Sequence, residues 1–73
     1  MNNESALMNS TPLARLIREQ GRLKGWLAKE MGCDRSRLSR ILSGERSMTL
    51  TEAARAARAL NVPIETFLPD EAA

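Results

Sequence analysis

The chain of 73 residues contains no histidine and no tyrosine, and it has one cysteine, one tryptophan and one phenylalanine. A single cysteine excludes an intramolecular disulfide and a cysteine cluster, and without histidine we expect no metal site. The sequence also lacks a glycine-rich phosphate loop and a setting for paired carboxylates, so we expect neither a cofactor nor an enzyme activity. The aromatic content of 3%, with 42% hydrophobic residues, favours a compact all-α domain over a β-sandwich.

Long hydrophobic runs are missing as well. No segment is apolar over the length of a signal peptide or a membrane span, so we predict an intracellular, cytoplasmic protein without a membrane partner. A chain of this length builds one small domain. Residues 1–10 are polar and without periodicity, and we interpret them as a flexible N-terminal arm before a domain over residues 11–69 and a C-terminal tail over residues 70–73.

Capping signals divide the domain into helices. Five are predicted, over residues 12–20, 24–31, 34–43, 49–60 and 64–68. Thr49 and Glu52 have the spacing of a capping box, and Pro63 precedes the last and shortest helix. In the alanine-rich fourth helix the expected inner stripe consists of Leu50, Ala53, Ala57 and Leu60.

The charges are unevenly distributed along the chain. Residues 15–46 hold nine basic and four acidic residues, a net charge of +5, whereas the rest of the chain holds two basic and five acidic residues, a net charge of −3. A cluster of cations of this kind is what a polyanion-binding surface requires, although a solvated charged face is the alternative for any charge run.

The segment from Met31 to Ser43 lies inside this basic region. Gly32 can end one helix with a positive φ, and Asp34 can cap the next. In that next helix Leu38, Ile41 and Leu42 have the spacing of an inward face. The side chains left pointing away from the core are cations and small hydroxyls, namely Ser36, Arg37, Ser39, Arg40 and Ser43.

Two further side chains are expected in or near the core. We interpret Cys33 as a small apolar plug inside the turn rather than as a redox sensor. Trp26 lies beside the apolar stripe of the second helix and is expected to pack against Leu23 and the first helix, the alternative being a contact with a dimer partner or with the N-terminal arm.

The pair Leu27-Ala28, the turn glycine Gly32, Ile41 and the step Leu60-Asn61-Val62 together resemble the Cro/CI-like (XRE) helix-turn-helix repressors. The resemblance covers residues 13–68 and implies a compact five-helix, lambda-repressor-like domain. In it the recognition helix, Arg35 to Ser43, lies in the major groove of double-stranded DNA. The chain departs from the family pattern in having Lys24 in place of a frequent Gln, Leu42 in place of a frequent acid, and Met48 in place of a loop proline.

The chemistry of these residues and the resemblance predict a sequence-specific transcriptional regulator, a repressor of phage or mobile-element type that binds a palindromic operator as a homodimer. Arginine can form bidentate hydrogen bonds with guanine, and the expected base-reading residues are Arg35, Ser36 and Arg40. The expected flanking contacts are Arg37, Ser39 and Ser43, and the expected phosphate contacts are Arg22, Lys24 and Arg46. The expected dimer interface is Ile64, Phe67 and Leu68.

Three alternatives remain open from the sequence. The same fold serves as the antitoxin of a toxin–antitoxin pair, with a toxin as a second partner, and a helical adaptor that binds only protein is also compatible with the helices. For Ile64, Phe67 and Leu68, the alternative to a dimer interface is that they close the monomer core over the first helix.

Overall fold

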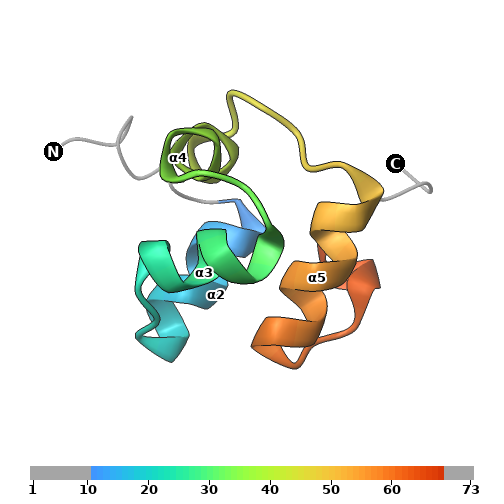
Figure 1. Cartoon of the computed structure of the whole chain (residues 1–73). Helices are drawn as coiled ribbons and strands as arrows, with labels where there is room; N and C mark the ends of the chain where they lie inside the picture. Colours follow the sequence, from blue (N-terminus) through green and yellow to red (C-terminus); the bar gives the residue numbers. More distant parts are fainter. Residues whose placement is uncertain (1–10, 69–73) are drawn as a thin grey trace, which may run out of the picture.

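The computed structural model describes residues 11–68, which form four α-helices and one 3-10 turn (Figure 1). With the labels of Figure 1 these are α2 (Pro12–Gln20), α3 (Lys24–Met31), α4 (Arg35–Ser43), α5 (Leu50–Leu60) and η1 (Ile64–Phe67). The described residues contain no strand, so the all-α prediction is confirmed for them. The predicted arm over residues 1–10 and the tail over residues 70–73 lie outside the described residues.

The prediction of a fifth α-helix is wrong. Residues 64–67 form a 3-10 turn, in which the amide of Thr66 donates to the carbonyl of Pro63 (3.0 Å) and the amide of Leu68 to that of Glu65 (3.2 Å). Prolines at positions 63 and 69 leave five residues between them. That is too few to establish a run of α-helical hydrogen bonds, and the tighter 3-10 pattern satisfies short segments of this kind.

The helix ends are where the capping residues predict them. Thr11 accepts the amide of Ala14 (3.1 Å) at the start of α2, and Thr49 accepts the amide of Glu52 (3.1 Å) within a complete capping box at the start of α5. The four α-helices end at residues with positive φ, Gly21, Gly32, Gly44 and Asn61. The start of α3 has no side-chain cap, because Leu23, which lacks a polar side chain, stands at the N-cap position. Local sequence therefore determines the helix boundaries.

The core is built from the inward faces of all four α-helices. Its largest fully buried side chains are Leu13, Leu27, Met31 and Leu38. On α5, Ala53, Ala57 and Leu60 are buried as predicted, but Leu50 is 69% exposed and Ala56 is buried in its place. Leu50 precedes Ala53 by three residues, which turn an α-helix through 300° and not a full 360°, so Leu50 lies at the edge of the stripe. Leu50 is also the first residue of α5 and therefore lies at the helix end.

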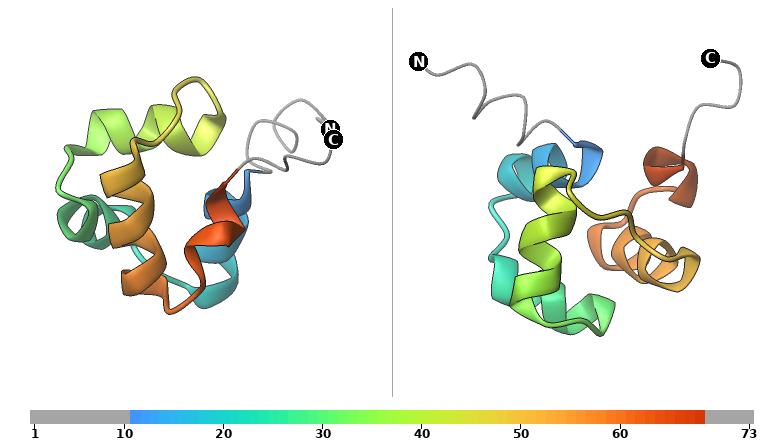
Figure 2. Two further views of the ribbon diagram at one scale, coloured as in Figure 1. Left: turned by 90° about the vertical axis from the view of Figure 1, so that its right-hand side faces the viewer. Right: turned by 90° about the horizontal axis from the view of Figure 1, so that it is seen from above.

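The helices pack so that α3 lies at the centre of the helix contacts. It packs against α5 on one side and α4 on the other, while η1 covers α5 and α2 (Figure 2). Among the side-chain hydrogen bonds that join distant segments, Gln20 Nε2 donates to the carbonyl of Leu60 (3.0 Å), and Thr11 Oγ1 donates to that of Leu42 (3.0 Å). In the left view of Figure 2, α4 lies at the upper edge of the molecule, and the loop over residues 44–49 runs from its end to α5. This places one whole face of α4 at the surface.

Candidate nucleic-acid interface

The pair α3 and α4 forms a helix-turn-helix unit. Gly32 ends α3 with a φ of 79°, and its amide bonds to the carbonyl of Ala28 (2.9 Å). Asp34 then caps α4 by accepting the amide of Arg37 (2.8 Å). The inward stripe of α4, which is Leu38, Ile41 and Leu42, is buried as predicted. This turn and this stripe together set which face of α4 is presented to solvent.

The three residues predicted to read bases lie on that presented face. Arg35, Ser36 and Arg40 are all exposed. Within the part of the chain that the structure describes, neither guanidinium has a hydrogen-bond or ion-pair partner. Both therefore retain their full set of N–H donors for a ligand.

The residues predicted to flank them have three different environments. Ser39 is exposed on α4. Ser43 is half-buried, and its hydroxyl donates to the carbonyl of Arg40 (3.0 Å), a bond that closes the end of the helix. Arg37 turns toward α5, where its guanidinium is already bound. The pattern of α4 predicts that Arg37 points away from the core. Its side chain is half-exposed, and the structure adds an acidic partner that this pattern does not indicate.

That partner is Glu52 in the first turn of α5. Arg37 Nε donates to Glu52 Oε2 (2.6 Å) and Arg37 Nη2 to Glu52 Oε1 (2.8 Å), with a further bond from Nη2 to the carbonyl of Ser47 (3.3 Å). The Arg37 side chain is 36% exposed and the Glu52 side chain 11%. A bidentate guanidinium–carboxylate pair at these distances joins α4 to α5.

The pair changes the acidity of the carboxyl group. Arg37 lowers the pKa of Glu52 from 4.5 to about 2, chiefly through the side-chain hydrogen bond, against the opposing effect of burial. The backbone amide of Thr49 also donates to Glu52 Oε1 (2.9 Å) and adds to the lowering of the pKa. From the sequence, Glu52 is recognisable only as the last member of the capping box. Its pairing with a residue 15 positions away depends on how α4 and α5 pack.

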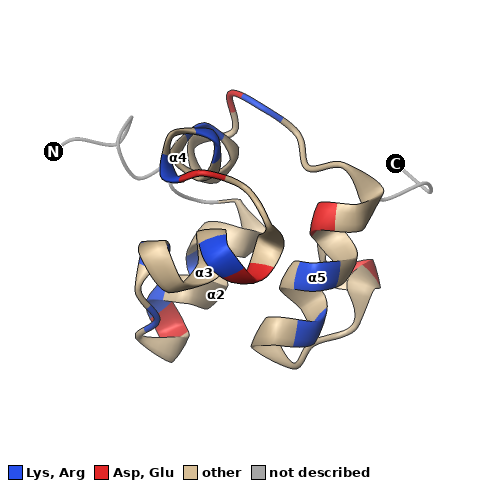
Figure 3. Ribbon diagram, in the orientation of Figure 1, with Lys and Arg blue, Asp and Glu red and all other residues tan. Residues whose placement is uncertain are grey.

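Basic residues predicted to contact phosphates occur on either side of α4 in sequence. Arg46 is exposed in the loop after α4, and Lys24 is exposed at the first position of α3. In Figure 3 one group of basic residues lies on α4 and the following loop at the top of the view, and another lies at the lower left, where α2 ends and α3 begins. Cations on both sides of a helix in the major groove match the positions of the two flanking phosphate backbones.

Arg22 and Trp26 form a cation–π pair beside this second group. The Arg22 guanidinium lies 4.7 Å from the centre of the Trp26 ring. Trp26 itself is half-buried against the core, whereas Leu23, its expected neighbour, is 76% exposed. Arg22 is exposed and keeps its positive charge over the ring, so it retains the chemistry of a phosphate contact.

Cys33 lies partly buried against the core, as predicted for a residue inside the turn. Burial raises the pKa of its thiol, with a smaller contribution from Glu52. A thiol held in the protonated form is a poor nucleophile and a poor metal ligand. Among residues 11–68 no group of histidine, cysteine, aspartate and glutamate side chains is arranged to hold a metal ion.

The predicted dimer residues are divided between core and surface. Phe67 packs against the hydrophobic core, which favours the alternative that this side chain closes the monomer. Ile64 is half-buried, and Leu68 is 43% exposed. Of the three residues, Leu68 therefore offers the most apolar surface to a second copy.

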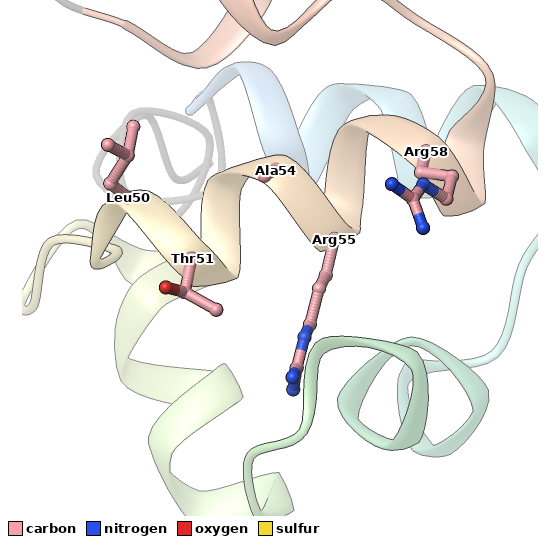
Figure 4. A pocket seen from close by; sticks show the side chains of 5 residues that line it. All are labelled: Leu50, Thr51, Ala54, Arg55 and Arg58. Carbon is pink, nitrogen blue, oxygen red and sulfur yellow. The ribbon is translucent and has the colours of Figure 1, made fainter.

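On the outer side of α5 a shallow hollow of about 320 Å³ is lined by Leu50, Thr51, Ala54, Arg55 and Arg58. Figure 4 shows Arg55 extending from α5 toward the turn between α3 and α4. There Arg55 Nη1 lies 3.5 Å from the carbonyl of Met31, close to Gly32. Arg37 and Arg55 thus connect α5 to both helices of the helix-turn-helix unit.

Comparison with known proteins agrees with this geometry. The family model described as helix-turn-helix matches residues 13–67, a range that runs from α2 to the end of η1 and contains α3 and α4. No curated protein and no solved structure matches the chain. No helix among the described residues has both the length and the apolar character needed to cross a membrane. Because the match covers most of the chain and includes the turn and both of its helices, the chain belongs to the Cro/CI-like (XRE) family of helix-turn-helix regulators, which act by binding DNA.

Proposed function

We propose that the chain is a sequence-specific repressor that binds a palindromic operator in double-stranded DNA as a homodimer. The observation that carries the proposal is the presented face of α4, on which Arg35 and Arg40 are exposed and have no partner among the described residues. An α-helix fits the major groove, and an unpaired arginine on it can form bidentate hydrogen bonds with guanine O6 and N7. In this proposal Arg35, Ser36 and Arg40 read bases, and Ser39 lies at the edge of the contact.

Phosphate contacts position the helix in the groove. Arg22 and Lys24 bind one backbone strand, because they lie just before and at the start of α3, and Arg46 binds the other, because it lies after α4. Release of condensed counterions from these phosphates makes binding depend steeply on salt.

A homodimer follows from the small size of a single reading helix. One short helix contacts only a few base pairs, and two-fold symmetry doubles the site that is read. The dimer surface is assigned to Leu68 and Ile64, next to the half-buried Phe67. Two half-sites centred about 34 Å apart on one face of the DNA would match this symmetry.

The proposal is tested by selecting duplexes from a random pool with the purified protein and measuring affinity for the selected site at several salt concentrations. We expect a palindromic site and an affinity that falls at least about tenfold between 50 and 200 mM salt. Arg40→Ala should relax the choice of base at one position of each half-site, and Arg46→Ala should weaken all duplexes alike.

Arg58→Ala is the matched control, because Arg58 is an exposed arginine on α5 rather than on α4. It should leave both the site and the affinity nearly unchanged. Failure of the wild-type protein to bind any duplex at low salt would refute the proposed function. A selected site that is unchanged by Arg40→Ala would refute the assignment of the reading face.

A further inference from the structure

The link between Arg37 and Glu52 joins α4, which carries the proposed reading face, to α5, which carries no part of that face. Arg37 lies on α4 between two residues proposed to read DNA, two positions after Arg35 and three before Arg40. Three hydrogen bonds, two to Glu52 and one to the carbonyl of Ser47, hold its guanidinium. A planar group bound at three points leaves the attached helix little freedom to rotate.

Apolar packing between α4 and α5 gives little restraint of this kind. The helix α5 packs mainly on α3 and η1, and α4 packs mainly on α2 and α3. The buried face of α5 consists largely of Ala53, Ala56 and Ala57. Small side chains interdigitate less than large ones and therefore define the relative position of two helices less sharply. Among the described residues, Arg37–Glu52 is the one side-chain hydrogen bond or ion pair that connects α4 directly with α5.

The carboxylate is itself held in place. Glu52 Oε1 accepts the amide of Thr49 (2.9 Å) while Thr49 Oγ1 accepts the amide of Glu52 (3.1 Å). The bond from the Thr49 backbone amide anchors the carboxylate to the first turn of α5, whereas the bond to Thr49 Oγ1 caps the helix backbone. Arg37 is thus bound to a rigid acceptor. This bond holds α4 in a defined orientation relative to the start of α5.

We propose that Glu52 is a positioning residue for DNA sequence recognition, which acts through Arg37 to set the orientation of α4 so that Arg35 and Arg40 meet their base edges. The inference rests on the proposed function. It also reassigns Arg37, because a guanidinium bound to Glu52 and Ser47 holds the helix in place instead of contacting DNA. Binding sites that depend on exact geometry tolerate displacements of only about 0.5 Å in the side chains that make the contacts.

The test compares Glu52→Gln, Arg37→Gln and the double variant with the wild-type protein. For each, affinity is measured for the selected operator and for an unrelated duplex, well below the unfolding temperature. We expect each single variant to lower the ratio of operator to unrelated affinity by about tenfold, the discrimination of one misplaced bidentate base contact. The double variant should lose no more than either single variant, because both remove the same link.

Thr49→Ala is the matched control for stability. It removes a capping hydrogen bond next to the pair but keeps the backbone amide that binds Glu52, so the affinity ratio should stay within about twofold of the wild-type value. Should Glu52→Gln not fold, Arg37→Gln still decides the matter, because Arg37 itself is 36% exposed and the backbone amide of Thr49 continues to bond the buried Glu52 carboxylate that the substitution leaves behind.

The outcomes distinguish a positioning role of Arg37 from a direct contact between Arg37 and DNA. Additive losses in the double variant, or a lower salt dependence in Arg37→Gln alone, would show that Arg37 contacts DNA directly and would overturn the proposal. An unchanged ratio in Glu52→Gln, or an equal loss in Thr49→Ala, would overturn it as well. A wild-type protein that binds no duplex refutes the proposed function and the inference together, whereas a wild-type protein that binds with an unaffected Glu52→Gln variant refutes the inference alone.

Discussion

The turn between α3 and α4 can be tested by adding one methyl group at Gly32. This residue has a φ of 79°, and a Cβ built on it would overlap Arg55 Nη1. An alanine in the left-handed conformation costs about 1 kcal/mol. The arginine must also turn away and give up its long hydrogen bond to the carbonyl of Met31 (3.5 Å), which adds about 0.5 kcal/mol. We therefore expect Gly32→Ala to lower the free energy of unfolding by about 1.5 kcal/mol.

Gly21→Ala is the matched control for the backbone alone. Gly21 also ends a helix with positive φ (65°), but no atom lies within 4 Å of the position its Cβ would take. Its expected cost is therefore the conformational cost of about 1 kcal/mol. For a domain of this size each kcal/mol corresponds to a shift of about 4–8 °C in Tm.

The assay is urea and thermal unfolding followed by circular dichroism, in a double-mutant cycle with Arg55→Ala. In the Arg55→Ala background, Gly32→Ala should cost no more than Gly21→Ala, because the obstructing side chain is gone. The exposed Arg58→Ala serves as the background control and should leave the difference between the two glycine variants in place. Equal costs for Gly32→Ala and Gly21→Ala in the wild-type background would refute the reasoning, since Arg55 would then exert no influence at the turn.

Two further outcomes follow from burial and from acidity. Leu27→Ala removes a fully buried side chain and should destabilise the domain by about 2–5 kcal/mol. Leu23→Ala, at a residue 76% exposed, should change stability by less than about 0.5 kcal/mol. Equal losses of stability for the two variants in chemical denaturation would contradict the described core. Because Arg37 lowers the pKa of Glu52 to about 2, the unfolded chain takes up a proton near pH 4.5 while the folded chain does not. The wild-type protein should therefore lose about 1–2 kcal/mol more stability than Glu52→Gln as the pH falls from 5 to 2, a value reduced by the solvent around Arg37. Parallel pH profiles for the two proteins would show that the pair contributes nothing.

Much of the fold could be predicted because its signals are local. Capping residues, glycines after helices and the apolar spacing of α4 act within one or two turns, and the structure confirms the bounds of α2 and α3. The helices α4 and α5 begin one residue later than predicted, because Asp34 and Thr49 are their N-caps. The errors occurred where local signals were weakest. Residues 64–67 were too few to form an α-helix. Leu50 was included in the α5 stripe by its i, i+3 spacing, which falls short of a full helical turn and takes no account of its position at the helix end.

The sequence by itself determined the helix-turn-helix unit, its family and the identity of the residues on the presented face, because helix periodicity and capping depend only on neighbours along the chain. The tertiary structure alone decided which of those residues remain free. Arg37 lies four residues before Ile41 and therefore nearer the buried stripe of α4 than Arg40 does, but this spacing names no partner. Arg37 is bound to Glu52 because α5 brings a buried carboxylate to it from 15 residues away, while the Arg40 guanidinium has no such partner among the described residues. Contacts between segments far apart in sequence follow from helix packing, which no local periodicity encodes.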